Sequence, residues 1–571
     1  MFSGLFESRS EEPFRFEMGL TKPSPLRTWA PRGKEEPVLR VHIVLAFVAT
    51  ALLFAVADRQ QRRDREETDF SSSPFLSVME GEKDGRVPPP TFKFSFNDLK
   101  VKARNLSKQR YSPPKLSTTD FLKGLPWNQY KNISFRAEKS IWKKEGNPFQ
   151  LQFLHPGHLY NTNVRVYEVR GDYAREIVYD PNAFDLSKLK GVGELPPDLG
   201  YSGFKVHFPI NTQEHTDEFA VFQGASYYRI ISKKQWYGLS ARGIAVNTGM
   251  PYPEDFPAFR EFYVVKPDKT DSSITVYALL DGRTATGAYE FQITPGKVSA
   301  VRVSAEVTLR TKVDRLGLAP LTSMYWYSET RGIPKGQAYP ESHDSDGLLI
   351  HTGKGEWVWR PLDNPKKSTV YSFPDENPKG FGLIQRDRDF HNYQDIEMKY
   401  QLRPSAWVEP ETSWGKGSVQ LLENPTVRDS DDNMGAFWVP DPLPQPGTPF
   451  EFSYTVRWPD ADPLPDSIAK VVATRIGDAQ GDPDLKMFYV DFKSSSLSSL
   501  DPFAYIQARI ETGENAELSE YSVQKIEESG VWRLTFGVYL KNRYRPSELR
   551  AALNRNQEII SETWNFTLEP N

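Results

Sequence analysis

The stretch AVRVSAEVTLR, residues 300–310, decides the fold class. Apolar side chains stand at every odd position from Val301 to Leu309, and polar or charged side chains stand at the even positions between them. Successive side chains of a strand point to opposite faces, so this stretch predicts a β-strand with one buried and one solvated face. Ile274–Leu280 and Tyr289–Ile293 have related patterns and are expected to be neighbouring strands.

Similar alternation recurs along the chain from Phe92 onward, for example in Phe450–Trp458 and Trp532–Leu540. Helical patterns are few. They are Asn97–Leu106 and Ser547–Leu553, the second of which opens on a Ser that suits an N-cap. No period of about 20–50 residues repeats, which argues against a propeller or a solenoid. The sequence therefore predicts an all-β fold.

The composition excludes several classes of protein. The chain of 571 residues carries 71 Lys and Arg against 75 Asp and Glu, and this near-neutral balance argues against a nucleic-acid partner. The absence of Cys excludes thiol catalysis, cysteine zinc sites and disulfides. Aromatic residues are plentiful, with 35 Phe, 26 Tyr and 13 Trp, and they can fill the core of a large β-protein.

One apolar run, residues 43–57, stands near the N-terminus. It is shorter than the about 20 residues that a bilayer span needs. It ends in Ala55-Val56-Ala57, which is the small-x-small pattern of a signal-peptide cleavage site, although an uncleaved membrane anchor is the alternative. Residues 1–42 are then a long N-terminal extension, and residues 58–90 have the composition of a disordered linker. Both alternatives place the rest of the chain outside the cytoplasm.

Prolines at positions 440, 442, 444, 446 and 449 interrupt the strand pattern. A central strand does not tolerate so many, because Pro cannot donate a hydrogen bond to its neighbour. We therefore expect a Pro-rich linker at 440–449 between a large β-domain, residues 91–439, and a small one, residues 450–571. Short alternating strands over about 120 residues suit an immunoglobulin-like sandwich.

Carboxylates in turns, close to aromatic and arginine side chains, gather in four segments: His343–Gly347, Gly355–Pro361, Gln385–Asp395 and Arg428–Trp438. Taken singly, each is typical of a structural turn, because Asp satisfies backbone N–H groups there. Together they indicate a carbohydrate site, in which aromatic faces cover sugar C–H surfaces and charged groups bind hydroxyls. The candidate substrate-binding residues are Trp357, Trp359, Arg360, Arg388 and Tyr393.

Nucleotide and metal motifs are absent, since the chain has neither G-x-x-x-x-G-K-[ST] nor H-E-x-x-H. Asp429–Asn433 is similar to a calcium loop, but Gly435 comes one place late and Pro440 stands where the closing Glu belongs. We therefore expect no cofactor and no metal. Crowded carboxylates cannot all ionise easily, so the acids of residues 429–432 offer a way to raise one pKa. Glycosidic cleavage needs one protonated and one ionised carboxyl group.

Nine short motifs resemble the pattern of the osmoregulated periplasmic glucan biosynthesis proteins G and D. The resemblance runs from about Phe92 to the end of the chain, and residues 1–90 lie outside it. The motifs are LQFLHPG (151–157), DLGYSGF (198–204), FQGASYY (222–228), YGLSARG (237–243), APLTSM (319–324), HDSDG (343–347), EWVWRP (356–361), GLIQRDR (382–388) and WVEP (407–410).

The resemblance implies a large mutarotase-like N-terminal β-sandwich joined to a small immunoglobulin-like C-terminal β-sandwich. It also implies a periplasmic role in making or trimming β-1,2-linked glucans. Some members of the family are β-1,2-glucan hydrolases or transglycosylases that act with inversion.

The resemblance also implies roles for individual residues. The general base falls on Asp344 and the general acid on Asp432. Asp429 stands three residues before Asp432, where family members often carry Glu, and its charge is expected to set the pKa of Asp432. Tyr130 ends a further family motif and joins the substrate-binding candidates.

Two functions remain open. The first is an enzyme that hydrolyses or transfers β-1,2-glucan with the Asp344 and Asp432 pair. The second is a non-catalytic glucan-binding assembly factor that works with an inner-membrane glucan synthase. Both use a β-1,2-glucan as ligand, and a homodimer is compatible with either.

Overall fold

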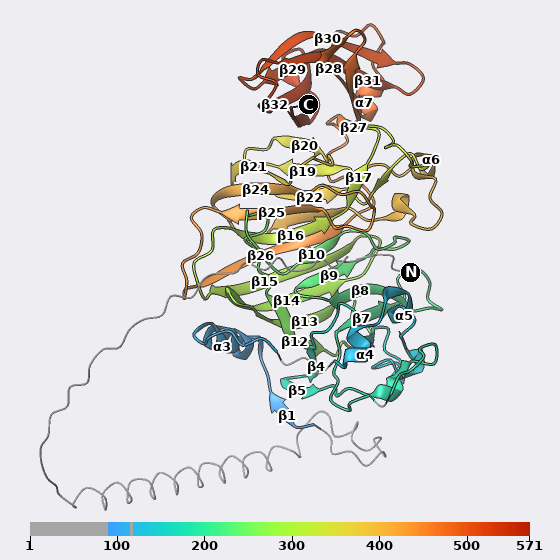
Figure 1. The fold of residues 1–571 in the computed structure, drawn as a ribbon, viewed down its shortest axis with the longest axis vertical. Coiled ribbons are helices and arrows are strands. Elements are labelled where there is room, and N and C mark those ends of the chain that lie inside the picture. The colour runs from blue at the N-terminus through green and yellow to red at the C-terminus, as the bar shows by residue number, and fades with distance from the viewer. Residues whose placement is uncertain (1–88, 115–117, 194, 571) are drawn as a thin grey trace, which may run out of the picture. The chain divides into compact units, whose positions relative to one another are not determined.

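The computed structural model describes residues 89–114, 118–193 and 195–570, shown in colour in Figure 1. The predictions for residues 1–42 and 43–57, and nearly all of the one for 58–90, lie outside the described residues. The prediction of an all-β fold is confirmed, because strands make up most of the regular structure and form several sheets.

The largest sheet has 16 strands and runs through both halves of the described chain. Across the sheet its strands are β1 (Thr91–Lys93), β5 (Tyr173–Glu176), β4 (Arg165–Arg170), β12 (Ala258–Val265), β13 (Ile274–Asp281), β14 (Ala285–Thr294), β15 (Ser299–Leu309), β26 (Pro449–Trp458), β23 (Ala406–Pro410), β22 (Gly380–Ile384), β19 (Gly347–His351), β20 (Trp357–Pro361), β34 (Thr563–Leu568), β32 (Ser547–Arg555) and β29 (Gln507–Thr512), with β33 (Glu558–Ile559) beside β32.

A second sheet of ten strands faces the first part of the large sheet. Its strands are β21 (Thr369–Glu376), β24 (Lys416–Glu423), β25 (Met434–Pro440), β16 (Leu316–Ser323), β10 (Ser240–Arg242), β9 (Tyr227–Ile230), β8 (Asp217–Gln223), β7 (Gly203–Phe208) and β3 (Gln150–Leu154), with β11 (Ala245–Val246) beside β16.

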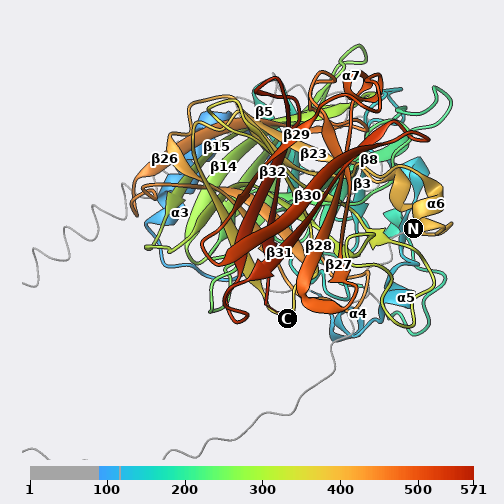
Figure 2. The same ribbon diagram turned by 90° about the horizontal axis from the view of Figure 1, so that it is seen from above.

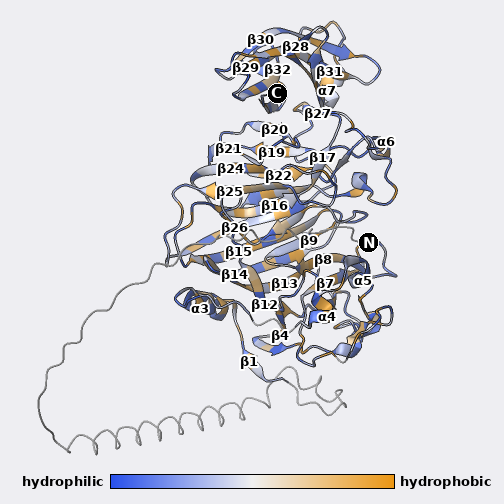
Figure 3. Ribbon diagram, in the orientation of Figure 1, coloured by the Kyte–Doolittle hydropathy of each residue, from blue (hydrophilic) through white to orange (hydrophobic). Residues whose placement is uncertain are grey.

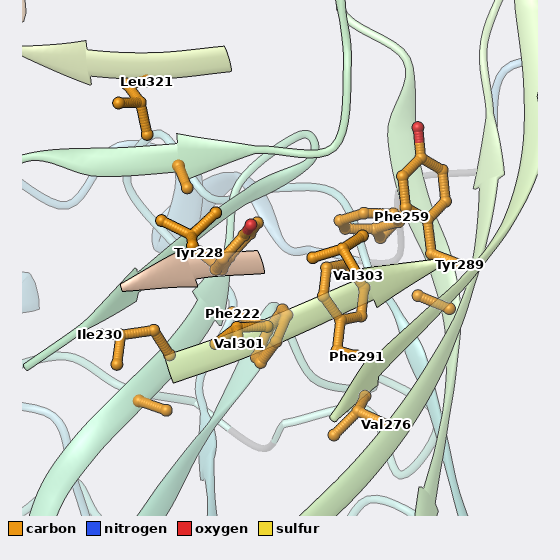
Figure 4. Packing of buried hydrophobic residues seen from close by; sticks show 14 of the residues in the cluster. Phe222, Tyr228, Ile230, Phe259, Val276, Tyr289, Phe291, Val301, Val303 and Leu321 are labelled. Carbon is orange, nitrogen blue, oxygen red and sulfur yellow. The ribbon is translucent and has the colours of Figure 1, made fainter. Parts of the chain in front are cut away.

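Aromatic and aliphatic side chains fill the space between these two sheets (Figure 4). Phe291 on β14 lies 5.4 Å from Phe222 on β8 and 5.3 Å from Tyr228 on β9, measured between ring centroids. Figure 3 shows hydrophobic residues gathered in central strands such as β22 and β25. This two-layer core is the sandwich that the alternating patterns predict.

Apart from a four-stranded sheet near the C-terminus, the remaining elements are helices, turns and two short strand pairs. They are the helices α3 (Phe96–Ser107), α4 (Asp120–Lys123), α5 (Trp127–Tyr130), α6 (Phe390–Tyr393) and α7 (Ser495–Ser498), the 3-10 turns η3 (Ala137–Lys139), η4 (Pro181–Ala183) and η5 (Tyr400–Leu402), and the paired strands β2 (Ser134–Phe135) with β6 (Phe184–Asp185) and β17 (Tyr325–Tyr327) with β18 (Ser342–His343). Within the described ranges, none of the helices is long and apolar enough to cross a membrane.

The strand predicted from residues 300–310 is β15, which pairs with β14 on one side and β26 on the other. Its apolar positions, such as Val301 and Val303, are buried in the sandwich core. The helix predicted at Asn97–Leu106 is α3, where Ser95 and Asp98 form a capping box. Both predictions are confirmed.

The helix predicted at Ser547–Leu553 is wrong, because these residues form β32. Leu549, Ala551 and Leu553 point to one face and are buried there. The strand is hydrogen-bonded to β29 and β34 on its two sides. Local helix propensity is weak compared with this tertiary pairing.

A second, smaller sandwich forms near the C-terminus. A four-stranded sheet of β27 (Lys470–Ala479), β28 (Asp482–Lys493), β31 (Val531–Leu540) and β30 (Ala516–Ile526) packs on β34, β32 and β29. Phe488 on β28, for example, lies 5.6 Å from the Trp564 ring on β34. Figure 2 views the molecule from above, with the strands of this sandwich toward the viewer.

The boundary predicted at residues 440–449 is corrected by the strand pairing. β26 begins at Pro449 and lies between β15 and β23, so it belongs to the large sandwich. The prolines therefore connect two strands of the same domain. The chain leaves that domain after Trp458 and enters the small sandwich at β27.

Arg386 joins the two sandwiches. Its guanidinium donates to Asp462 Oδ2 at 2.6 Å, and to the two carboxylate oxygens of Glu562, just before β34, at 2.6 and 2.9 Å. It also lies 3.5 Å from the ring centroid of Trp359 on β20. Next to this contact, β20 and β34 pair in parallel, so the large sheet continues from one domain into the other.

Candidate active site

Asp344 follows β18 and is held from two sides. Its backbone N–H donates to the carbonyl of Met324 at 2.8 Å. Its carboxylate is almost fully buried and forms an ion pair with Arg403, which follows η5. Arg403 also lies 4.3 Å from the ring centroid of Tyr400, so the guanidinium is sandwiched between a carboxylate and an aromatic face.

Asp432 ends the loop that leads into β25. The next residue, Asn433, donates to the carbonyls of Tyr325 and Asn424 at 2.9 and 2.8 Å and accepts from the Tyr325 N–H at 2.9 Å. These bonds fix the loop against β17, the strand that pairs with β18. The Asp432 side chain is 43% exposed and lies 3.5 Å from the Arg229 guanidinium.

Asp344 and Asp432 belong to one electrostatic cluster. Burial raises the pKa of Asp344, Arg403 opposes that rise, and the charge of Asp432 adds to it. Desolvation also raises the pKa of Asp432, against the opposing effects of Arg229 and Arg403. The structure therefore brings the two predicted catalytic carboxyls together around Arg403.

Asp429 lies beside this cluster, where its carboxylate accepts a hydrogen bond of 3.3 Å from the Tyr400 hydroxyl. The charges of Asp429 and Asp431 are the predicted cause of the raised pKa of Asp432. Burial is instead the largest cause of the raised pKa of Asp432, and Asp431 is the acid that adds to it. Asp431 accepts from Arg428 at 2.8 Å and from Thr426 at 2.9 Å.

Arg388 and Tyr393 are hydrogen-bonded to the residues behind the site. Arg388 donates to the carbonyls of Gln401, at 3.3 Å, and Arg403, so it holds the segment that carries Arg403. Tyr393 is fully buried and accepts a hydrogen bond of 2.8 Å from the Gln385 amide. A ring without exposed surface cannot stack on a sugar, so the substrate-binding prediction for Tyr393 is corrected to a supporting position.

Trp357, Trp359 and Arg360 lie on β20, beside the small sandwich. Trp359 and Arg360 are 3% and 1% exposed, too little for either to contact a substrate. Arg360 donates to Asn565 and Thr567 on β34 at 3.1 and 2.9 Å. Trp357 stacks on His351 at 3.9 Å and packs against the core of the small sandwich. Trp359 and Arg360 join the domains, which corrects the prediction that they bind substrate, whereas Trp357 is half-buried and its role stays a prediction.

Tyr130 lies on α5, in a separate aromatic group with Tyr160 and Trp127, whose rings are 5.8 and 5.9 Å away. Its hydroxyl donates to the carbonyl of His155 at 2.7 Å. The side chain is 9% exposed. α5 and α6 lie on the same side of the molecule in Figures 1 and 2. The contacts of Tyr130, however, are with its own helix and with the part of the chain between β3 and β8.

A buried histidine stands directly beside Asp344. His343 Nε2 lies 2.9 Å from Glu341 and 3.7 Å from Asp346, and its Nδ1 lies 3.1 Å from the Gln385 Oε1 atom. Glu341, His343 and Asp346 have the spacing that a metal ion requires. Although burial lowers the pKa of His343, the surrounding carboxylates outweigh it and raise the pKa to about 9. The raised pKa favours the protonated imidazole, which pairs with the acids.

A comparison with protein-family models places this geometry in context. Residues 94–568 match the family described as periplasmic glucan biosynthesis protein, MdoG. The chain belongs to this family. The match covers both sandwiches and every residue of the site, and it confirms the family resemblance found in the sequence motifs.

Curated relatives support the same assignment for this glucan biosynthesis family member. Proteins named glucans biosynthesis protein G from Pseudomonas paraeruginosa and from Pseudomonas aeruginosa are each 42% identical over 493 residues, which are 84% of this chain and 94% of the relative. The protein of that name from Pectobacterium carotovorum is 42% identical over 492 residues, with the same coverage.

Sequence reasoning missed the two arginines of this family member's site. Arg403 and Arg229 stand far from Asp344 and Asp432 in the chain, and only the strand pairing brings them together. A Cβ at Gly238 would lie 2.9 Å from the Cβ of Arg403, so the glycine in YGLSARG leaves room for the arginine.

Proposed function

We propose that this protein acts on the β-1,2-glucan backbone by inverting hydrolysis or transglycosylation. Asp344 serves as general base and Asp432 as general acid. The observation that supports this most is the shared cluster, in which both carboxyls have raised pKa values and Arg403 acts on each of them. Membership in the glucan biosynthesis family supports glucan as the substrate.

The chemistry needs the two carboxyls in different protonation states. Asp432 donates its proton to the glycosidic oxygen as the C–O bond breaks, and Asp344 takes a proton from the attacking water or sugar hydroxyl. The ion pair with Arg403 favours the ionised form of Asp344 that a base requires. The half-open position of Asp432 suits an acid that must reach the substrate. A hydrogen-bonded water or hydroxyl can carry the proton to Asp344 when it is not in direct contact.

The test is turnover of linear β-1,2-glucan by the chain from residue 85 onward, with product size followed over time. Hydrolysis shortens the polymer, and transglycosylation redistributes its lengths without loss of total linkages. An unchanged size distribution after long incubation at high enzyme concentration contradicts the enzymatic proposal.

Arg403→Met is expected to move both limbs of the pH profile of kcat/KM to higher pH. Arg403 lowers the pKa of Asp344 and also that of Asp432, so its removal lets both pKa values rise. The base then needs a higher pH to ionise, and the acid stays protonated to a higher pH. The profile is measured for both proteins on β-1,2-glucan, with Arg302→Met, an exposed arginine on β15, as the control. A profile with unmoved limbs shows that Arg403 does not tune the pair.

The second candidate is a glucan-binding assembly factor that works with an inner-membrane glucan synthase. The direct ion pair of Asp344 with Arg403 favours it, because a carboxylate neutralised by a guanidinium is a weaker base. The same incubation distinguishes the two. Tight binding of β-1,2-glucan without any change in its size supports the assembly factor.

We also propose that the protein works in the periplasm, either exported by an N-terminal signal or held by an N-terminal anchor. The support is the apolar run at residues 43–57 and the family to which the chain belongs. A reporter that is active only in the periplasm, fused after residue 80, is expected to be active. Activity of a cytoplasm-only reporter at the same position would overturn this.

A further inference from the structure

Trp236 is an exposed tryptophan. Among the described residues, it is the only tryptophan with more than a third of its side chain in contact with solvent, at 38%. Tryptophan is usually mostly buried, and an exposed indole leaves part of a large, flat, apolar face open to pack against a ligand. Its position relative to the candidate active site is therefore informative.

The indole stands on a hydrogen-bonded segment between β9 and β10. The Ser232 N–H donates to Gln235 Oε1 at 2.8 Å, and the Lys234 N–H donates to Asn211 Oδ1 at 2.7 Å. The Trp236 N–H itself donates to the carbonyl of Leu402 at 3.0 Å. These bonds fix the backbone before any ligand arrives, which reduces the entropy that binding must overcome.

This segment is directly connected to the candidate active site. Leu402, the partner of the Trp236 backbone, is adjacent to Arg403, which forms the ion pair with Asp344. Two residues after Trp236, Gly238 allows Arg403 to approach closely. The Lys399 ammonium lies 4.2 Å from the centroid of the indole. An aromatic face and a cation therefore stand together beside the Arg403 segment.

We propose that Trp236 and Lys399 form a binding subsite for a glucose unit of the glucan chain, next to the cleavage point. The C–H face of the sugar ring packs on the indole, and Lys399 moves from the ring to donate hydrogen bonds to hydroxyls. This inference rests on the proposed function, because it takes the same polymer as ligand. An exposed cation–π pair is weak, so a sugar can displace the ammonium from the ring face.

The test compares the affinity of wild type, Trp236→Ala and Trp236→Phe for linear β-1,2-glucan by calorimetry. Losing the stacked face is expected to weaken binding by about tenfold for Ala, on the basis of the apolar area lost. Phe keeps a flat ring and is expected to restore most of the affinity. Phe503→Ala is the matched control, since Phe503 is 95% exposed on the small sandwich and is expected to leave binding unchanged.

The outcomes separate the two proposals. Wild type that binds the glucan while Trp236→Ala binds equally well overturns the subsite and leaves the proposed function standing. Wild type that binds no β-1,2-glucan overturns the proposed function and the subsite with it. Glucan binding without turnover still tests the subsite, because the measured quantity is affinity. Unfolding midpoints of the variants, expected to match wild type, show that lost affinity is not lost folding.

Discussion

Replacing Asp432 with Asn is expected to slow turnover of β-1,2-glucan by about 10²–10⁴-fold, the usual effect of losing a general acid. Asn keeps the shape of the side chain, although its contact with Arg229 is no longer an ion pair. It has no carboxylic acid proton to give to the leaving oxygen. Affinity for the glucan is expected to change little, because the proton is transferred in the transition state. Initial rates and binding constants measured on the same preparation check both parts.

Asp271→Asn provides the control for this experiment. Asp271 is an exposed carboxylate in the loop between β12 and β13, where its oxygen accepts from the Asp268 N–H at 2.8 Å. This variant is expected to turn over glucan at the wild-type rate. Full activity in Asp432→Asn would remove Asp432 from the role of general acid, and full activity in Asp344→Asn would do the same for the base.

Replacing Arg386 with Met is expected to lower the free energy of unfolding by about 3–5 kcal/mol, as for other buried ion pairs that lose one partner. The variant leaves Glu562 and Asp462, whose side chains are 0% and 5% exposed, without their cation. Denaturant unfolding followed by fluorescence measures the loss. Arg302→Met, which removes an exposed pair with Glu411, is expected to cost about 0–1 kcal/mol.

The loss in Arg386→Met is also expected to shrink as the pH falls. Burial raises the pKa of Glu562 and Arg386 opposes that rise, so without Arg386 the folded-state pKa is higher still. A carboxyl whose folded pKa lies above its unfolded pKa destabilises the fold when ionised, and acid relieves it by protonation. An equal loss for Arg386→Met and Arg302→Met at neutral pH would show that the buried network does not hold the domains together.

The fold class could be predicted from the sequence because strand alternation is a local property. The pattern of Val301–Leu309 needs no knowledge of its partners, and β15 has the expected bounds to within a residue or two. The domain boundaries could not be predicted as well from the sequence. Prolines at 440–449 look like a linker, yet β26 begins at Pro449 and inserts between β15 and β23. Pairing of strands from distant parts of the chain cannot be predicted from the sequence of either strand alone.

The residues of the site also fall into those that the sequence reveals and those that it does not. Asp344, Asp432 and Asp429 could be named from motifs, and in the structure Asp429 lies beside the cluster that Asp344 and Asp432 form. Trp359 and Arg360 have the right chemistry for sugar binding, but their strand lies against β34, where the small sandwich buries them. Arg403, Arg229 and Trp236 carry no motif that separates them from other surface residues. Only their neighbours in the folded chain give them a role.

The central position of β26 has a consequence for the order in which the chain can fold. β15 and β23 both keep an unpaired edge until residues 449–458 are present, because β26 is the strand that lies between them. The large sheet therefore cannot close before 458 of the 571 residues are available. The main domain therefore stays incomplete, with open sheet edges, until most of the chain has been synthesised.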